Sequence, residues 1–368
     1  MSDATRLEDA YAEWLQAQRT ALDIILGAGR SLERERVEGV RYVSRLTALA
    51  LALYVENNDP LHPRLERNLD EHSKKFACDN PDTLYWRAPI RAGETYRLWG
   101  CLGNSPYTAI ALEVDLFSES DLPKGTVAQY LAEEYRTGDD QRFEVTLSRD
   151  PQPGNWIEIP EGVTNLLVRQ TFLHEADRAS GALHLERLSG DRGSRRPLSP
   201  DQLIDGLKAA SRFLVGCITM FKAMADAWAH NNTNGFGYSG ASADGKSRSG
   251  ADPHVNYFQG YWRLAPDEAL VIAFEEPEQF RLWSFMLANY WSESLDYAAQ
   301  PRIATNSERV RPDSDGKIVL VIAHEDPGMP GWVSTDGCSE GLMLLRWVLA
   351  DSPLKPPAVT LCKLSALK

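Results

Sequence analysis

The sequence predicts a mainly β protein with helical additions (α+β): a β-sandwich built from two β-halves, with an N-terminal helical layer and a long central helix. Two observations lead to this prediction. From residue 84 onward, short runs rich in β-branched and aromatic residues are separated by Gly, Pro, Asp and Asn turns, as in sandwiches and barrels. In residues 1–77 and again from residue 198, apolar residues instead recur at helical spacing.

The N-terminal helical region, residues 1–77, is predicted to contain two helices. Apolar side chains recur on one face from Leu7 to Leu26, and Gly27 ends that run. A second apolar helix is expected over residues 35–56.

The long central helix follows the first β-half. Ser199 suits the N-cap, Pro200 the first helical position, and Gln202 completes a capping box. Beyond the helix lies a Gly/Ser-rich segment, which we expect to be flexible and able to close over a binding site. The expected regions are residues 1–77, 78–197, 198–252 and 253–368.

The two β-halves show an internal similarity in their sequence patterns. Residues 80–114 and 256–291 share an order of aromatic strand, acid-containing turn, apolar strand, turn and third strand. Such self-similarity predicts two similar β-halves that close one sandwich, with the capped helix as the connector.

Composition excludes several partner classes. The net charge of −13 lacks the basic footprint that nucleic acids and anionic membranes require, so neither is an expected partner. No signal peptide or membrane span is visible, and the five scattered cysteines suit a reducing compartment, so the expected location is cytoplasmic. A homo-oligomer is compatible with these features.

Several motifs together resemble a bacterial family. They are YWRLAPDEALVI, LWSFMLANYWSESLDY, DGKIVLVIAHEDPGMPGWVSTDG and GLMLLRW, with NPDTLY and NLLVRQ upstream. In this order they resemble the domain of unknown function 1214 and the β-half that usually precedes it, over roughly residues 78–350. The resemblance implies a β-sandwich with helical additions and no settled chemistry. Gly331, Ser334 and Cys338 depart from the family pattern, which often has Asn, Asp, and His or Arg at these positions.

The strand-end segment 321–337 holds the candidate catalytic residues. His324 and Asp326, two apart on an extended chain, would point the same way and form a base with its orienting carboxylate, and Asp336 adds a further acid. Trp332 would supply an apolar wall. Alternatively, Asp326 only caps the turn and His324 bonds to backbone.

A second cluster follows at residues 288–297. If the strand continues, Asn289, Trp291 and Glu293 share one face and suit a pocket for a ring-shaped ligand, with Trp262 as a further apolar wall. The alternative is that these aromatic residues close the end of the sandwich.

A third candidate is Arg169, which lies within the apolar stretch NLLVRQTF and therefore needs a partner. Arg169 or Tyr85 could hold the polar end of a ligand. The alternative is an ion pair between Arg169 and Asp82 that ties two strands together.

Several common motifs are absent from the sequence. It has no HExxH, P-loop or GxSxG motif, which removes the usual zinc-protease, nucleotide and serine-hydrolase interpretations. The stretch GFGYSG matches GxGxxG by letter, but it follows a helix rather than a strand and is expected to be a loop.

The leading hypothesis is a small-molecule protein, an acid–base enzyme of lyase, isomerase or hydrolase type without an organic cofactor. Its substrate would be a hydrophobic ring-containing compound of aromatic, terpenoid or steroid type. One alternative is a non-catalytic ligand- or carbohydrate-binding sandwich. A further one is a metal-dependent enzyme using His324 and Asp326, although no specific metal motif is present.

Overall fold

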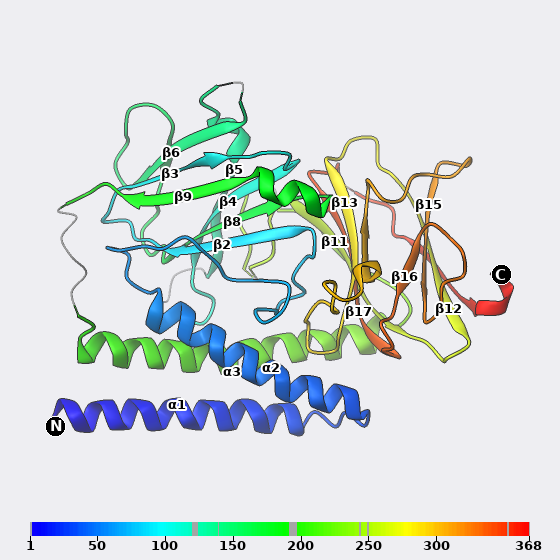
Figure 1. Ribbon diagram of the computed structural model, residues 1–368, viewed down its shortest axis with the longest axis horizontal. Coiled ribbons are helices and arrows are strands. Elements are labelled where there is room, and N and C mark those ends of the chain that lie inside the picture. Colours follow the sequence, from blue (N-terminus) through cyan, green and yellow to red (C-terminus); the bar gives the residue numbers. More distant parts are fainter. Residues whose placement is uncertain are drawn as a thin grey trace. The chain divides into compact units, whose positions relative to one another are not determined.

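The computed structural model describes residues 2–119, 124–138, 140–190, 197–242, 244–248, 250–351 and 353–367. It contains 27% helix and 32% strand, with the strands in four sheets, which confirms a mainly β fold with helical additions (Figure 1). The sequence suggested one compact unit, but the chain divides into two, and each β-half has two sheets of its own. Unit 1 comprises Met1–Asp70, Thr83–Thr219 and Asp244–Asp252, and unit 2 comprises Glu71–Asp82, Met220–Ala243 and Pro253–Lys368.

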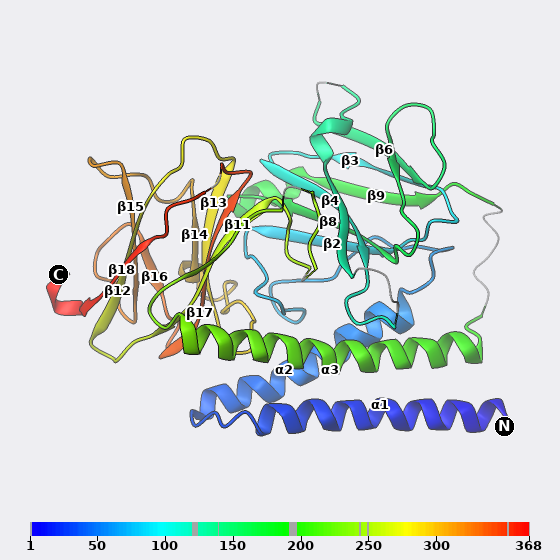
Figure 2. The same cartoon turned by 180° about the vertical axis from the view of Figure 1, so that it is seen from behind.

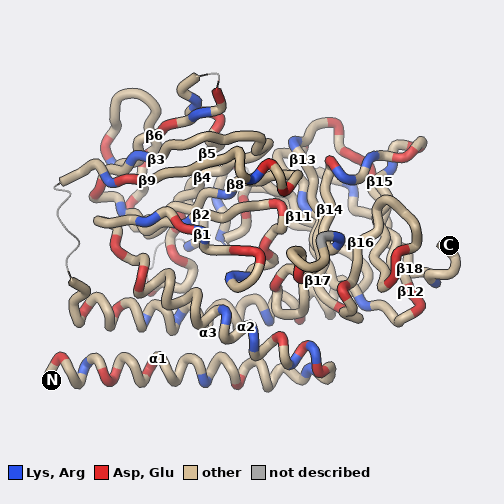
Figure 3. The backbone as a smooth tube through the Cα atoms, in the orientation of Figure 1, with Lys and Arg blue, Asp and Glu red and all other residues tan. Residues whose placement is uncertain are grey.

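The predicted helices are confirmed. The N-terminal pair consists of α1 (Asp3–Leu26) and α2 (Glu33–Leu51), and α2 continues into the π-turn η1 (Ala52–Glu56). The buried face of α1 is a stripe at helical spacing against α2, whereas acidic and basic residues are interspersed along the helix (Figure 3). None of the described helices is long and apolar enough to cross a bilayer.

The central helix α3 (Pro200–Asn231) begins with the predicted capping box. The Gln202 backbone N–H donates to Ser199 Oγ over 3.2 Å, and the Ser199 N–H donates to Gln202 Oε1 over 3.0 Å. These bonds satisfy two donors that the first helical turn leaves unpaired. The N-terminal part of α3 belongs to unit 1 and the rest to unit 2.

Unit 1 contains a five-stranded and a four-stranded sheet within its described residues. The larger sheet has the order β1 (Glu66–Arg67), β2 (Thr83–Pro89), β8 (Asn165–Thr171), β4 (Tyr107–Val114), β5 (Gly125–Leu131). The smaller sheet has the order β7 (Trp156–Glu158), β6 (Arg142–Ser148), β3 (Tyr96–Cys101), β9 (Ala182–Arg187). Apolar residues of both sheets, including Tyr96, Phe143 and Val168, form one core. The short helices of this unit are η2 (Ala132–Tyr135) and η3 (Glu175–Ser180).

Unit 2 repeats this arrangement in the described part of its chain. Its larger sheet has the order β10 (Gly237–Ser239), β11 (Val255–Arg263), β17 (Glu340–Val348), β13 (Leu282–Ala288), β14 (Ala304–Asn306). Its smaller sheet has the order β16 (Trp332–Ser334), β15 (Lys317–Ala323), β12 (Glu268–Glu275), β18 (Ala358–Lys363), and Figure 2 shows β18 beside β12. Two short helices, η4 (Pro301–Ile303) and η5 (Leu364–Ala366), complete the unit.

The strand order of unit 1 is therefore repeated in full in unit 2. Adding nine to each strand number of unit 1 reproduces both sheet orders of unit 2. The repeat extends to pairing direction, because β6 pairs with β7 in parallel and β15 pairs with β16 in parallel, while the other paired strands are antiparallel. Corresponding positions in the two units can thus be read from strand register.

The segment GFGYSG, expected to be a loop, contains the edge strand β10. Tyr238 in this strand donates from its hydroxyl to Asn256 Oδ1 over 2.8 Å, and its ring packs on Phe258 at 5.0 Å between centroids. The local sequence alone did not predict a strand here. Pairing with β11 and the contact between Tyr238 and Phe258 stabilise it. The wider Gly/Ser-rich segment, expected to be flexible, includes residues 243 and 249, which lie outside the described residues.

Glu94 in unit 1 predicts an acid-dependent loss of stability. Burial alone would raise the pKa of Glu94, but hydrogen bonds from Arg91, Ser189 and Arg187 outweigh it and lower that pKa to about 2. The carboxylate therefore stabilises the fold above its ordinary pKa of 4.5, and this contribution disappears as pH falls toward 2. We expect it to be roughly 2 kcal/mol, because solvent screens part of the shift.

The measurement compares urea unfolding of wild type and Glu94→Gln from pH 6 to pH 2. The difference in free energy of unfolding is expected at pH 6 and should vanish toward pH 2. A difference that stays constant over this range would show that Glu94 titrates normally.

Candidate functional site

His324 directly follows β15 in unit 2 and is held by one hydrogen bond. Its Nδ1 lies 2.8 Å from Oγ1 of Thr335, a side chain with 0% exposure. The imidazole itself is half-buried, and Nε2 makes no hydrogen bond within the described residues. A histidine with one ring nitrogen fixed and the other open has the arrangement that proton transfer requires.

The two aspartates of this segment shape its turns. Asp326 is exposed, and its Oδ1 accepts a hydrogen bond from the Gly328 N–H over 2.7 Å, which is an Asx turn. Asp336 has a left-handed backbone with φ of 49°, and its N–H donates to Ser334 Oγ over 3.1 Å. The partner of His324 is thus Thr335, whereas the sequence suggested Asp326.

Trp332 and Arg302 lie beside the end of β15, the strand that His324 follows. The Trp332 indole N–H donates to the carbonyl of Ala323, the residue before His324, over 3.1 Å. The Arg302 guanidinium lies over the indole ring at 5.3 Å from its centroid, because η4 packs against β16. The indole ring packs with Val321 and Ala323, the strand positions that alternate with His324. Within the described residues, neither Trp332 nor Arg302 forms a hydrogen bond with His324. Among the described residues, no group of three or more His, Cys, Asp or Glu side chains is arranged to hold a metal.

The second cluster forms a tight turn rather than a continued strand, because β13 ends at Ala288. Asn289 Oδ1 accepts from the N–H groups of Trp291 and Glu293 over 3.0 and 3.1 Å, and its amide donates to the Glu293 carboxylate over 3.0 Å. Trp291 is buried and packs edge-on against Tyr290. Asn289, Trp291 and Glu293 are brought together, but around a turn.

Residues 71–82 connect this turn to the larger sheet of unit 2. Asp79 accepts from the backbone and hydroxyl of Ser294 over 3.0 and 2.6 Å. Burial raises the pKa of the Asp79 carboxyl, although the nearby Lys75 lowers it. No sequence motif indicated that these two segments pair, because more than 200 positions separate them.

Trp262 lies on β11 with 0% exposure, opposite Gly341 in β17. Its indole N–H has no hydrogen-bond partner in the described part of the chain. A Cβ at Gly341 would lie 3.2 Å from this nitrogen, so the glycine makes room for the ring. Trp262 is therefore a core residue of the sheet.

Tyr85 and Arg169 lie opposite each other on β2 and β8 in unit 1. Arg169, 6% exposed, donates to Gln129 Oε1 over 3.1 Å and to the Gly250 carbonyl over 2.8 Å. Its carboxylate partner is Glu113, at 3.6 Å, whereas Asp82 pairs with Arg309 in unit 2 at 3.5 Å. The sequence suggested Asp82 as the partner of Arg169, and the structure places the Glu113 carboxylate beside it.

The repeat identifies two residues that sequence reasoning missed. Tyr257 and Arg346 lie opposite each other on β11 and β17, as Tyr85 and Arg169 do in unit 1. The signal was present: DNPDTLY before Arg169 corresponds to ADPHVNY before Arg346 when the tyrosines are aligned, which places Pro81 on Pro253.

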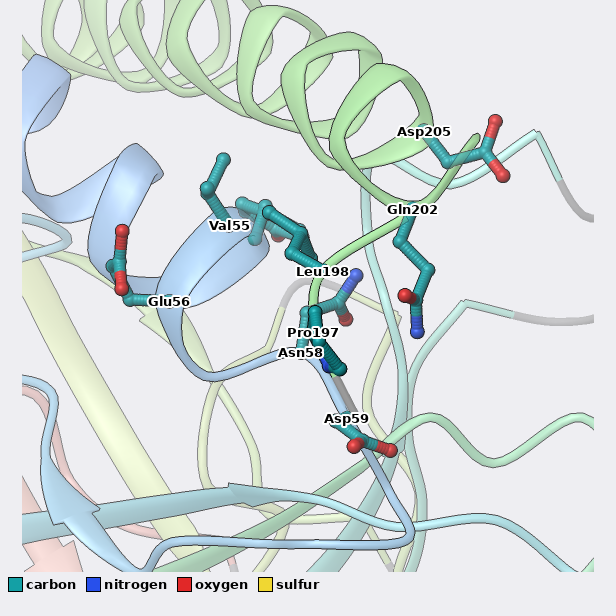
Figure 4. Close-up of a pocket in the computed structure, with 9 residues that line it drawn as sticks. Val55, Glu56, Asn58, Asp59, Pro197, Leu198, Gln202 and Asp205 are labelled. Atoms are coloured by element: carbon teal, nitrogen blue, oxygen red, sulfur yellow. The ribbon is translucent and has the colours of Figure 1, made fainter. Parts of the chain in front are cut away.

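A cavity of about 530 Å³ lies in unit 1 between the end of η1 and the start of α3 (Figure 4). Glu56, Asn58 and Asp59 line one side and Gln202 and Asp205 the other, with the Asp205 carboxyl pointing away from Gln202 in Figure 4. Its described lining contains no Arg, Lys or His, so it offers neither a base of the His324 type nor a partner for an anion.

The departures from the family pattern have local explanations. Gly331 packs so tightly that a Cβ would lie 2.0 Å from the Val319 carbonyl oxygen. Ser334 caps the turn at Asp336, and Cys338 is buried. These residues support the His324 segment, and none of the three contacts the imidazole through a described hydrogen bond.

Comparisons with known proteins agree with this architecture. Residues 263–349 match a family model described as a protein of unknown function (DUF1214). No curated protein matches the chain. The crystal structure of a Vibrio parahaemolyticus protein, VPA0106, is similar in fold, with a TM-score of 0.53 at 12% identity over 98% of this chain and 100% of that one.

A second solved structure extends the likeness to sequence. An uncharacterized protein from Burkholderia cenocepacia is 30% identical, with a TM-score of 0.90 over 99% of each chain. The likeness thus includes both repeated units and the helices. The chain belongs to the DUF1214 family of proteins of unknown function.

Proposed function

We propose that the protein is an acid–base enzyme acting on a small ring-containing compound, with His324 as the general base. The observation that carries this proposal is the fixed imidazole: Thr335 holds Nδ1 at 2.8 Å, while Nε2 has no partner among the described residues. When Nδ1–H donates to the hydroxyl, the lone pair of Nε2 can accept a proton from substrate or water. No organic cofactor is needed for such a step.

Two side chains beside the end of β15, Trp332 and Arg302, suit a hydrophobic substrate with a polar end. Trp332 is half-buried, and Arg302 places a cation over its ring. An aromatic wall with one cation favours a ring-shaped compound that carries a carbonyl, hydroxyl or carboxyl group. Within unit 2, Arg302 therefore takes the polar-end role that the sequence suggested for Arg169 or Tyr85.

The test follows hydrogen–deuterium exchange at the carbon next to the carbonyl of cyclic ketones in D₂O, and hydrolysis of 4-nitrophenyl esters. Both report a general base without knowledge of the natural substrate. Wild type should catalyse at least one of them, and His324→Gln should reduce the rate by about 10²–10⁴-fold with an unchanged melting temperature. Thr335→Val should reduce it less and should shift the pH profile, since it only positions the ring.

His184→Gln is the matched control, because His184 is an exposed histidine of unit 1 that stacks on Trp99. Equal rates in wild type and His324→Gln, or equal losses in both histidine variants, would exclude His324 as the base.

A non-catalytic binding protein, for example for carbohydrate, is the second candidate. The half-buried Trp332 ring favours it, because aromatic faces stack on sugars. In that case oligosaccharide binding should survive His324→Gln and disappear with Trp332→Ala, and no exchange should be catalysed.

A further inference from the structure

The repeat provides an internal comparison for two buried arginines. Arg169 and Arg346 each lie on the central strand of a five-stranded sheet, each opposite a tyrosine. In each unit, Nη2 of the arginine donates to a backbone carbonyl of a segment that covers the sheet. The acceptors are Gly250 at 2.8 Å for Arg169 and Cys78 at 2.6 Å for Arg346.

The charge of Arg169 is balanced within unit 1. Ala109 lies opposite Arg169 on β4, and Glu113, four residues further along the same face of β4, places its carboxylate 3.6 Å from the guanidinium. Gln129 accepts from the other terminal nitrogen. Both terminal nitrogens of this buried arginine therefore have acceptors.

The charge of Arg346 is not balanced in this way. Ser284 lies opposite Arg346 on β13, so the position that corresponds to Glu113 is Ala288. Arg346 is 7% exposed, and in the part of the chain that the structure describes its Nη1 has no hydrogen-bond partner and no carboxylate forms an ion pair with it. An unpaired buried charge costs several kcal/mol unless something else neutralises it.

Other groups around Arg346 suit a bound anion. The Tyr257 ring lies 5.9 Å from the guanidinium. The buried Ser292 hydroxyl makes no hydrogen bond within the described residues, although it is close enough to the Cys78 thiol to lower the pKa of that thiol. Cys78 contacts both groups, since its N–H donates to the Ser292 carbonyl over 2.7 Å and its carbonyl accepts from Arg346.

The backbone at this place is strained in a manner typical of ligand sites. Ala77, Cys78 and Ser292 all have left-handed φ values, of 60°, 54° and 63°. Burial raises the pKa of the Cys78 thiol to about 12, so the neutral thiol cannot act as counter-ion near pH 7.

We propose that Arg346, together with Ser292, binds the carboxylate of a small organic acid in the place that Glu113 fills in unit 1. The carboxylate would accept charge-assisted hydrogen bonds from Nη1 and from the Ser292 hydroxyl. A carboxylate is favoured over other anions because it is the group that neutralises the corresponding arginine of the repeat. This site is independent of His324.

The experiment measures binding of sodium acetate and sodium benzoate by titration calorimetry and by the shift in melting temperature, at constant ionic strength. Acetamide and benzamide serve as neutral analogues of the same shape. Wild type should bind at least one acid and neither amide. Arg346→Met should weaken binding by about tenfold or more, and Arg346→Lys, which keeps the charge without the planar fork, should weaken it less.

Ala288→Glu is the decisive variant, because it places the carboxylate of unit 1 at the corresponding position of unit 2. It should fold, should abolish acid binding and should not lower the melting temperature. Acetate has no ring to pack against Trp332, so loss of acetate binding in Ala288→Glu tests this site alone, and failure of this proposal is distinguishable from failure of the proposed function. Absence of binding in wild type, binding that survives both Arg346→Met and Ala288→Glu, or an equal response to phosphate, which would indicate an adventitious ion only, would overturn the proposal.

Discussion

Replacing Arg169 by leucine is expected to lower the free energy of unfolding by about 4 kcal/mol, whereas Arg346→Leu should cost no more than about 1 kcal/mol. Without Arg169 the buried Glu113 loses its counter-ion, and the Gly250 carbonyl and Gln129 amide each lose a donor. Among the residues that the structure describes, Arg346 has no such carboxylate. Its removal loses the bond to Cys78 but also removes an unpaired charge from the core.

Urea unfolding followed by circular dichroism measures both losses at pH 7, with each variant compared with wild type. The double variant Arg169→Leu/Glu113→Gln should recover part of the loss, because the buried charge is then absent. An equal loss in free energy of unfolding for the two single leucine variants would mean that the arginine charge is neutralised to the same extent in both units. The same outcome would count against an anion site at Arg346.

Gly331→Ala is expected to destabilise the protein by about 3 kcal/mol. The added Cβ would lie 2.0 Å from the carbonyl oxygen of Val319, and backbone cannot move away as a flexible side chain can. Relief of this clash separates β16 from β15, whose pairing includes the bond from the Val321 N–H to the Gly331 carbonyl over 2.9 Å. Thr335 follows β16, so the support of His324 should loosen at the same time.

Thermal and urea unfolding measure the loss, and the imidazole resonances of His324 in NMR report its hydrogen bond to Thr335. Gly93→Ala is the matched control, because a Cβ at Gly93 would meet nothing within 4 Å. It should leave stability nearly unchanged. A small effect of Gly331→Ala would show that β16 can shift without cost.

Long strands were predictable because their own residues form apolar runs of strand length. NLLVRQT and KIVLVIA are apolar runs bounded by turns, and they form β8 and β15. The edge strands β1, β10, β14 and β16 have two or three residues each, too few to show a period. Their pairing is decided by the neighbouring strand, and the sequence therefore did not indicate them.

The candidate site was predictable in its residue types but not in its pairings. His324 does follow a buried strand, yet its partner Thr335 is 11 positions away and has no motif that marks it. The sequence marked Arg169 as a buried cation, because an apolar run surrounds it. Arg346 in GLMLLRW has the same surroundings, and only the alignment of the two halves shows that Ala288 stands where unit 1 has Glu113.

Each unit includes a segment that precedes a strand of the other in the sequence: residues 71–82 precede β2, and residues 244–252 precede β11. During synthesis the ribosome completes β8 well before it reaches Gly250, the carbonyl partner of Arg169. At roughly 5–20 residues per second this delay is about 4–16 s. During this time the nascent first half contains Arg169 without Gly250, its carbonyl acceptor. A ribosome stalled within α3 would therefore present chaperones with a half-finished sandwich, and translation speed there becomes part of folding.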